Sequence, residues 1–503
     1  MGAAPVSMLD AAAQGLMGIL AWKSLAMMLI GIVISCTLVA MPGIGSKTAI
    51  ALLLPFAFSL DKYAAIALIV SVWAVSNTAN SITSILFSVP GGSGSQATIL
   101  DGYPMARRGE AARALSAAFT ASALGGIFGA LVLLAAIPVM KPLVLLLGPP
   151  EFFALVVLGV CMVGALSGKS PRKGVIVGAL GLAISMVGIH GVTGIPRFTL
   201  DQLYLFDGLP LIPITIGLFA IPELIFLVSK GASVSDVELG DLSAGRRQGI
   251  RDAFDNWWLM TRSSILGVWV GMIPGLGSSV ADWFAYGYAR QTCPGAEETF
   301  GKGDVRGVIA VDAATNAKEG GSLIPTLAFG IPGSSTLALI FGGLVIVGVT
   351  PGKEILTTQL DVTFSLIWLL IISSVLTSIL CLMFVRQFAM ATRIRPALLA
   401  PTILAMSVIG AFAASNRFAD VLTMMAFGVL GYVMRLAGWP RPPLLLGLVL
   451  GPLAERYMWT SYQLYDVWFL TRPGVLVIFG LMLAGILLPK LRRLRGPTPA
   501  PAE

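Results

Sequence analysis

Residues 82–96 read ITSILFSVPGGSGSQ, an apolar segment that breaks into proline, glycine and serine. Residues 324–336 read IPTLAFGIPGSST and match the first stretch in isoleucine, phenylalanine, proline and glycine, 242 positions later. A second pair, PGIGS at 42–46 and PGLGS at 274–278, lies 232 positions apart and keeps the same order. The chain therefore contains an internal repeat, and each half carries two glycine-proline motifs.

The composition places these motifs in a membrane. Of 503 residues, 56% are hydrophobic and 12% charged, against about 25% charged in a soluble domain. A helix needs about 20 apolar residues to cross a bilayer, and apolar runs of roughly that kind occupy residues 25–40, 117–139, 143–166, 211–227, 364–384, 403–414, 421–434 and 475–488. The pattern predicts an all-α polytopic membrane protein with about 12 transmembrane or re-entrant helices.

Basic residues predict the orientation of the chain. Lysine and arginine gather at residues 105–113, 168–174, 245–254, 386–396 and 489–495, and the positive-inside rule assigns such loops to the cytoplasm. The C-terminus is therefore expected to be cytoplasmic, whereas residues 290–306 fit this scheme less easily. We interpret the net charge of +8 as a topology signal, and we expect a lipid bilayer and no nucleic acid as partner.

The two halves differ in the charge that follows their motifs. Three arginines follow the first motif at residues 101–113, whereas residues 348–361 after the second hold one lysine and two acids. This asymmetry favours two inverted repeats with Gly/Pro-broken hairpins. We expect the chain to divide into a first membrane repeat with flanking helices, a cytoplasmic loop, a second repeat, C-terminal transmembrane helices and a cytoplasmic tail, at residues 15–230, 231–262, 263–395, 396–490 and 491–503.

The broken segments predict a binding site. Backbone groups freed by proline and glycine are tolerated at membrane depth only where they face protein or a water-filled cavity. Paired interrupted segments in two halves are the best sequence indication of a transporter's substrate site. The N-terminal ends of helices at these breaks attract anions, and unwound backbone carbonyls can hold a cation. Side-chain hydroxyls and amides can bind carboxylates. The motifs and the helices before them offer such groups on Ser93, Ser95, Ser334, Ser335, Thr336, Asn77, Asn80 and Asn316. The alternative is that glycine and serine only allow close helix packing.

Longer motifs resemble a known family. MPGIGSKTAIALLLPFAF from residue 41, NSITSILFSVPGGSGSQATILDGYPMARRGEAARAL from residue 80, and DAATNAKEGGSLIPTLAFGIPGSSTLALIFGGLVIVGVTPG from residue 312 are similar to the large membrane subunit of the tripartite tricarboxylate transporters. The resemblance runs from about Gly15 to Lys490. It implies a bacterial inner-membrane permease that imports carboxylates, citrate among them, on a sodium or proton gradient. The implied partners are a small membrane subunit of about four helices and a periplasmic solute-binding protein; no cofactor is expected.

The resemblance also implies a substrate site at the glycine-proline motifs. The candidate residues are Gly43, Gly45, Ser46, Lys47, Asn80, Pro90, Gly91, Gly92, Ser93, Gly275, Gly277, Ser278, Asn316, Pro332, Gly333, Ser334, Ser335 and Thr336. A sodium site is expected near Asn77, Asn80 and Asn316. By analogy with carriers that have paired hairpins, we expect alternating access by an elevator-like movement.

Charged residues near the motifs leave alternatives open. A cation inside a membrane segment is a functional candidate, so Lys47 is a candidate counter-charge for a substrate carboxylate, unless it reaches the interface. Lys318 is followed by Glu319, which can neutralise it. Asp282 and Asp312 could bind a proton or sodium, or could serve in loops or ion pairs.

Two other function classes compete with a carrier. A passive channel for small anions can also be built from glycine-rich re-entrant loops. A membrane-embedded enzyme would need a nucleophile, an acid-base pair or a metal site. With one histidine and four scattered cysteines, the sequence disfavours an enzyme, a disulfide framework and a metal site of histidine and cysteine.

Overall fold

The computed structural model describes residues 7–39, 46–57, 60–92, 94–166, 170–190, 193–230, 245–274, 277–349, 352–391, 396–480 and 482–483. These residues are almost entirely helical, and their only strands form a two-residue antiparallel pair, β1 (Gly188–Ile189) with β2 (Pro196–Arg197). Within the described residues, five helices are long and apolar enough to cross a membrane: residues 22–39, 62–87, 111–145, 360–387 and 418–436. The predicted all-α membrane class is confirmed, while the number of 12 crossings stays a prediction.

The same order of helices occurs twice. The first series follows α1 (Met8–Leu20) and consists of α2 (Trp22–Val39), α3 (Ser46–Ala57), α4 (Lys62–Phe87), α5 (Thr98–Arg107) and α6 (Ala111–Leu145). The second consists of α12 (Trp257–Met272), α13 (Gly277–Thr292), α15 (Val305–Phe329), α16 (Ser335–Ile346) and α17 (Leu360–Ala391). The second series also holds the one-turn α14 (Ala296–Thr299). In both series, one glycine-proline motif lies between the first and second helices and the other between the third and fourth.

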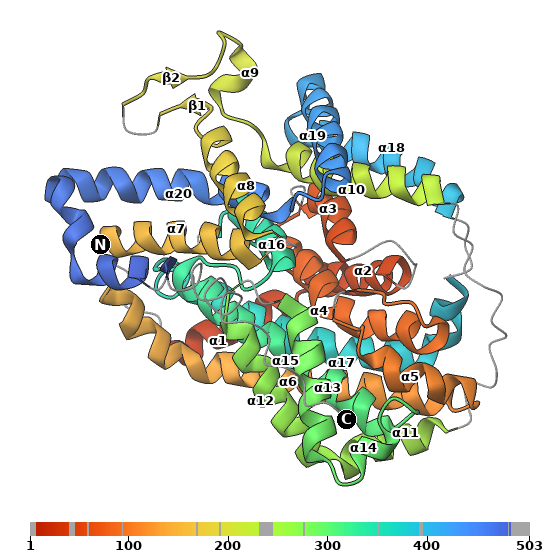
Figure 1. The fold of residues 1–503 in the computed structure, drawn as a ribbon. Helices are drawn as coiled ribbons and strands as arrows, with labels where there is room; N and C mark the ends of the chain where they lie inside the picture. The colour runs from red at the N-terminus through yellow and green to blue at the C-terminus, as the bar shows by residue number, and fades with distance from the viewer. Residues whose placement is uncertain are drawn as a thin grey trace, which may run out of the picture.

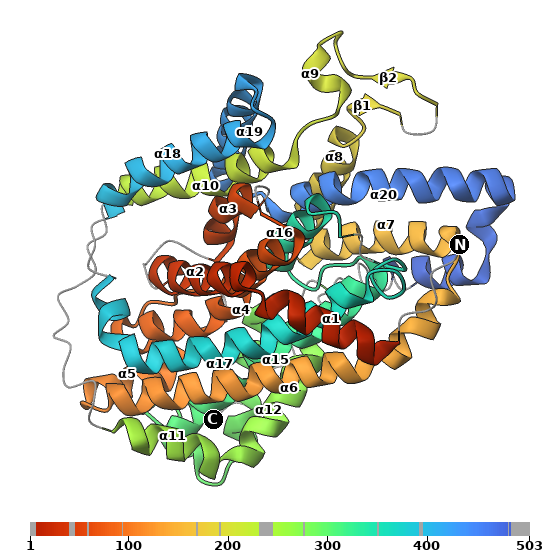
Figure 2. The same cartoon turned by 180° about the vertical axis from the view of Figure 1, so that it is seen from behind.

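Helices α4 and α15 form the centre of the molecule (Figures 1 and 2). Nearly every residue of both is buried. They run antiparallel, because Asn77 contacts Glu319 while Ser81, further along α4, contacts Asp312, further back along α15. The two series are interleaved, since α6 packs on α15 and α17 packs on α4.

Small residues allow this dense centre. A Cβ on Gly129 of α6 would lie 2.4 Å from the Ala317 carbonyl oxygen, and one on Gly271 of α12 would lie 2.4 Å from the Lys318 carbonyl oxygen. Backbones that approach this closely are typical of small-residue seams between membrane helices. The two sides of α15 are therefore fixed by glycine contacts with α6 and α12.

Most of the remaining helices lie in two groups around this centre (Figures 1 and 2). One contains α7 (Pro149–Leu166), α8 (Pro171–Ile184) and α20 (Pro442–Tyr465), followed by the 3₁₀ helix η1 (Asp466–Thr471). The other contains α10 (Leu211–Lys230), α18 (Pro396–Ser415) and α19 (Phe418–Leu436). The β1–β2 pair and the short α9 (Leu203–Phe206) project beyond α8 in both views.

Three details differ from the sequence-based expectations. The apolar run expected from residue 143 belongs in part to α6, which continues through Pro138 and Pro142 to Leu145, so the break lies at residues 146–148. The segment 231–262, expected as a loop, contains α11 (Arg246–Asp255) and the start of α12. Cys36 and Cys381 are distant in sequence, but their sulfur atoms lie 3.8 Å apart between α2 and α17, as free thiols.

Candidate functional site

The glycine-proline motifs that begin at Pro90 and Pro332, called the PG motifs below, break their helices in the same way. Helix α4 ends at Phe87 and the following Ser88 is left-handed, with φ 56°. Helix α15 ends at Phe329 and the following Gly330 is left-handed, with φ 69°. In each half the chain then passes through the motif before the next helix begins, so the interruptions expected from proline and glycine are present.

The tip of each motif folds back onto the helix that precedes it. A Cβ on Gly91 would lie 2.8 Å from the Asn80 Cα atom, and a Cβ on Gly333 would lie 3.0 Å from the Ser322 Cα atom. Gly91 and Gly333, and equally Asn80 and Ser322, are 242 positions apart, the offset of the sequence repeat. The two motifs therefore make the same glycine contact, which a larger residue could not make without moving backbone.

A small cavity lies where the two motifs meet the crossing of α4 and α15. Its lining comes from both halves of the chain: Trp73, Ser76, Asn77, Asn80, Gly92, Ser278, Lys318, Glu319, Ser334 and Thr336. Its volume is about 20 Å³, counted as the space that the centre of a water molecule can occupy. One water needs about 10–15 Å³ counted in this way. In this conformation the cavity has room for about one particle of the size of water.

A buried ion pair forms one wall. Lys318 is 1% exposed and Glu319 4% exposed, and the Lys318 Nζ atom lies 3.0 Å from Glu319 Oε1. Lys318 also donates to the Ser278 hydroxyl at 2.9 Å, and the Asn77 amide donates to Glu319 Oε1 at 2.7 Å. The expected neutralisation of Lys318 by Glu319 is thus observed, and the pair adds no net charge to the cavity.

Two oxygens on lining residues remain without hydrogen-bond partners among the described residues. They are Glu319 Oε2 and Asn80 Oδ1. Both side chains are more than nine-tenths buried, where a polar atom normally has a partner. The cavity wall therefore combines one buried cation, one buried anion and two acceptors with unused capacity.

A second polar cluster lies behind the first motif. Asp312 is 2% exposed and accepts hydrogen bonds from the hydroxyls of Ser81, Thr98 and Ser122. Asp282 is fully buried and accepts from the backbone N–H groups of residues 96 and 97. Neither carboxyl has an ion-pair partner among the described residues. Both lie within helices, and Asp282 holds the connection at residues 96–97 that precedes α5.

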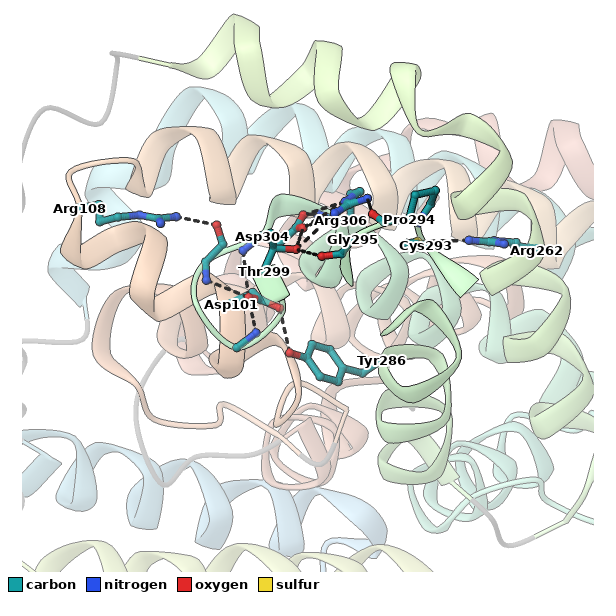
Figure 3. A network of polar contacts seen from close by, with 12 residues as sticks. Asp101, Arg108, Arg262, Tyr286, Cys293, Pro294, Gly295, Thr299, Asp304 and Arg306 are labelled. Carbon is teal, nitrogen blue, oxygen red and sulfur yellow. Dashed lines mark hydrogen bonds and ion pairs between the residues drawn. The ribbon is translucent and has the colours of Figure 1, made fainter. Parts of the chain in front are cut away.

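Loop 301–304, which directly precedes α15, encloses the Asp101 side chain from α5 (Figure 3). Asp101 Oδ1 accepts from the backbone N–H groups of Gly301, Gly303 and Asp304 at 2.8 to 2.9 Å, and Oδ2 accepts from the Tyr286 hydroxyl. Burial raises the pKa of Asp101, although these donors oppose the rise. The contacts join the helix after the first motif to the loop before α15.

Loop 301–304 is itself held by an ion pair, which Figure 3 also shows. Arg306 Nη2 donates to Asp304 Oδ2 at 2.6 Å, and the Thr299 hydroxyl donates to the same oxygen. Burial alone would raise the pKa of Asp304, but the Arg306 and Thr299 hydrogen bonds and the Arg306 charge bring it below its ordinary value. The segment 290–306, difficult to place by charge, is therefore an ordered connection.

The structure brings together only part of the predicted site. Six of the predicted residues line the cavity: Asn77, Asn80, Gly92, Ser278, Ser334 and Thr336. The motif tips are built by Pro90 and Gly91 in the first half and by Pro332 and Gly333 in the second. Gly277 begins α13 in a left-handed conformation. Asn316 is not in the lining; its amide donates to Ser122 and to the Asp312 carbonyl. Ser95 is buried and does not line the cavity. Its backbone carbonyl accepts a hydrogen bond from the Ser84 hydroxyl.

Several predicted residues cannot be placed in this way. Gly43, Gly45, Ser93 and Gly275 lie outside the described residues. Ser46 and Lys47 open α3, and Ser335 opens α16, but their side chains are likewise outside the description. The role expected for Lys47 therefore stays a prediction.

Sequence reasoning missed Trp73 and Ser76 and did not select Lys318 and Glu319 for the substrate site. Counting back from Asn80 by three, four and seven positions leads to residues 77, 76 and 73, which share one face of a helix. The helical period applied to α4 could therefore have found them. The Lys-Glu sequence alone did not show whether the pair faces the cavity.

Comparison with known proteins supports the resemblance. The model of the tripartite tricarboxylate transporter TctA family matches residues 25–446. A protein of Agrobacterium vitis, described as an uncharacterized 52.8 kDa protein in the TAR-I ttuC' 3' region, is 31% identical over 440 residues, which cover 85% of each chain. An uncharacterized protein in the TAR-II ttuC' 3' region of the same organism is 32% identical over 229 residues, 45% of this chain and 94% of that protein. No solved structure matches the chain significantly.

Proposed function

The chain belongs to the tripartite tricarboxylate transporter TctA family, and we propose that it is the permease subunit that carries carboxylates, citrate or related organic acids, through the cavity between its two PG motifs. The observation that supports this most is the convergence of both motifs on one cavity with a buried lysine. Transport is the activity of the family, and no enzyme activity is proposed.

Two helix starts in the cavity wall favour an anion. Helix α16 starts at Ser335, and its cap residue Ser334 and first-turn Thr336 are in the lining; helix α13 starts at Gly277, next to Ser278. The first N–H groups of a helix and its dipole attract negative charge. Lys318 is paired with Glu319 and adds no net charge, but a charged pair buried inside a membrane segment is itself expected to serve function.

The position of the cavity supports inverted repeats. The offset of 242 positions relates Asn77 to Glu319 and Ser76 to Lys318, and all four residues line the cavity. Because α4 and α15 run antiparallel and cross at the Asn77–Glu319 contact, a two-fold axis in the membrane plane would pass through the site. Carriers with such repeats place their substrate at this position and alternate between two inward- and outward-open states.

The small volume of the cavity requires a conformational change. A tricarboxylate is several times larger than water, so the cavity must widen before such an acid can lie within it. We propose that one substructure carrying both motifs moves in an elevator-like manner against a scaffold, driven by a sodium or proton gradient. The proposed location is the bacterial inner membrane with a cytoplasmic C-terminus, and the proposed partners are the small membrane subunit and a periplasmic binding protein.

The test is uptake into proteoliposomes that hold the chain, its small subunit and its binding protein. Radiolabelled citrate and a panel of di- and tricarboxylates would be offered under imposed sodium or proton gradients. We expect saturable accumulation above the external concentration for at least one acid. Flux that only equilibrates, whatever the gradient, would instead favour a passive anion channel, and a chemically altered product would favour an enzyme. Absence of flux for every acid would contradict the proposal.

A further inference from the structure

We propose that the cavity binds a sodium ion between Glu319 and Asn80, and that this ion gives the site the positive charge that attracts a carboxylate. The inference deepens the proposed function, but binding of the ion can be measured without transport. It begins from the two oxygens, Glu319 Oε2 and Asn80 Oδ1, that lack partners among the described residues.

The ligand chemistry fits a hard cation. Carboxylate, amide and hydroxyl oxygens are the ligands of such ions, and the lining offers the two unpartnered oxygens with the Ser76 and Thr336 hydroxyls. Ser278 accepts from Lys318 and keeps a second lone pair. The volume of about 20 Å³ is enough for one water molecule, and a bare sodium ion is smaller than that.

The charges explain why the ion would be coupled to an anion. Lys318 and Glu319 sum to zero and are bonded to each other through Oε1, so the pair alone has little attraction for a carboxylate. A sodium ion on Oε2 would leave Glu319 shared between two cations and the site with one net positive charge. A buried net charge is costly unless it is paired, and a substrate carboxylate would supply the partner.

Coupling of this kind is reciprocal. If sodium raises the affinity for the carboxylate, the carboxylate raises the affinity for sodium by the same factor, typically about 5–150-fold.

The experiment measures binding of ²²Na⁺ to the purified full chain in lipid nanodiscs. We expect saturable binding that unlabelled sodium displaces and choline does not, and about tenfold tighter binding when citrate or another transported acid is present. Asn80→Ala and Glu319→Gln should each weaken binding about tenfold or more. The double variant Lys318→Met with Glu319→Gln should also lose binding, and it leaves no unpaired buried charge, so it serves if Glu319→Gln fails to fold.

The matched control is Thr377→Val, a near-isosteric change of a buried hydroxyl in α17 that lines no part of the cavity. It should bind ²²Na⁺ as the unaltered chain does. Absence of saturable binding, or equal binding in the Asn80 and Glu319 variants, would overturn the inference. Proton-driven citrate uptake without sodium binding would overturn the inference while leaving the proposed function intact. Sodium binding without uptake of any acid would support the sodium site and contradict the proposed function.

Discussion

At the scale of single residues, Lys318 and Glu319 show what the sequence reveals and what it conceals. The sequence identified a lysine in a membrane segment beside an acid, because such residues are rare there. It could not show that the pair faces the cavity, since that depends on how α15 crosses α4 and α13. For the same reason Asn316 was predicted in the site but bonds instead to Ser122, one turn away from the cavity.

Substitution of Lys318 tests this pair. Lys318→Met leaves the Glu319 carboxylate buried without a cation, which should lower stability by about 3–5 kcal/mol, whereas Lys318→Met with Glu319→Gln should be close to neutral. Thermal unfolding in detergent measures the stability, and citrate uptake measures function. We expect the double variant to recover stability but not uptake. Recovery of both stability and uptake in the double variant would mean that the charges of the pair have no part in transport.

At the scale of elements, the motif tips were the most predictable feature. Proline and glycine at equivalent places in two halves predicted both breaks, because the helix cannot continue through them. The continuous α6 was not predictable in this way, since Pro138 and Pro142 remain inside it. Membrane helices tolerate proline where neighbours satisfy the freed groups, and the neighbours are set by the whole fold.

The tips give a paired prediction. Gly91→Ala and Gly333→Ala each place a Cβ against the backbone of the preceding helix, so each should cost about 1–3 kcal/mol and reduce citrate uptake strongly. Gly287→Ala is the matched control, because a Cβ at this α13 position meets nothing within 4 Å. Uptake and unfolding temperature are measured for all three. Equal behaviour of the three variants would contradict the role given to the tips.

The contact between the β1–β2 pair and α20 gives a pH prediction. Arg197 donates to both Glu455 carboxylate oxygens, and these hydrogen bonds, with the Arg197 and His190 charges, lower the pKa of Glu455. A carboxyl with a lowered folded-state pKa contributes stability above its unfolded value of about 4.3, and the contribution is lost as the pH falls through the lower folded value. It should be constant from about pH 7 to pH 5.

Arg197→Met should therefore lower stability by about 1 kcal/mol near pH 7 and less below pH 4. Unfolding temperature as a function of pH measures both. Arg251→Met is the control, since the Arg251–Asp255 pair is largely exposed and such pairs contribute little. A destabilisation by Arg197→Met that does not diminish in acid would contradict the account.

At the scale of the whole molecule, composition and the repeated motifs were enough to predict an all-α membrane protein with a site between its halves. Which helices pack together was beyond the sequence, because the two series are interleaved through α6 on α15 and α17 on α4. The glycine seams that fix this arrangement resemble ordinary small-residue positions until the partner backbone is known.

The central claim is that carboxylates pass through the cavity between the two motifs. The most direct measurement is the labelling of Thr336→Cys, in a chain whose four native cysteines are replaced by serine, with a membrane-impermeant thiol reagent added from either side of proteoliposomes. The account predicts labelling from both sides, because access alternates, and slower labelling when citrate or another acid of the panel is present. Labelling from one side only, or at a rate that no carboxylate changes, would contradict it.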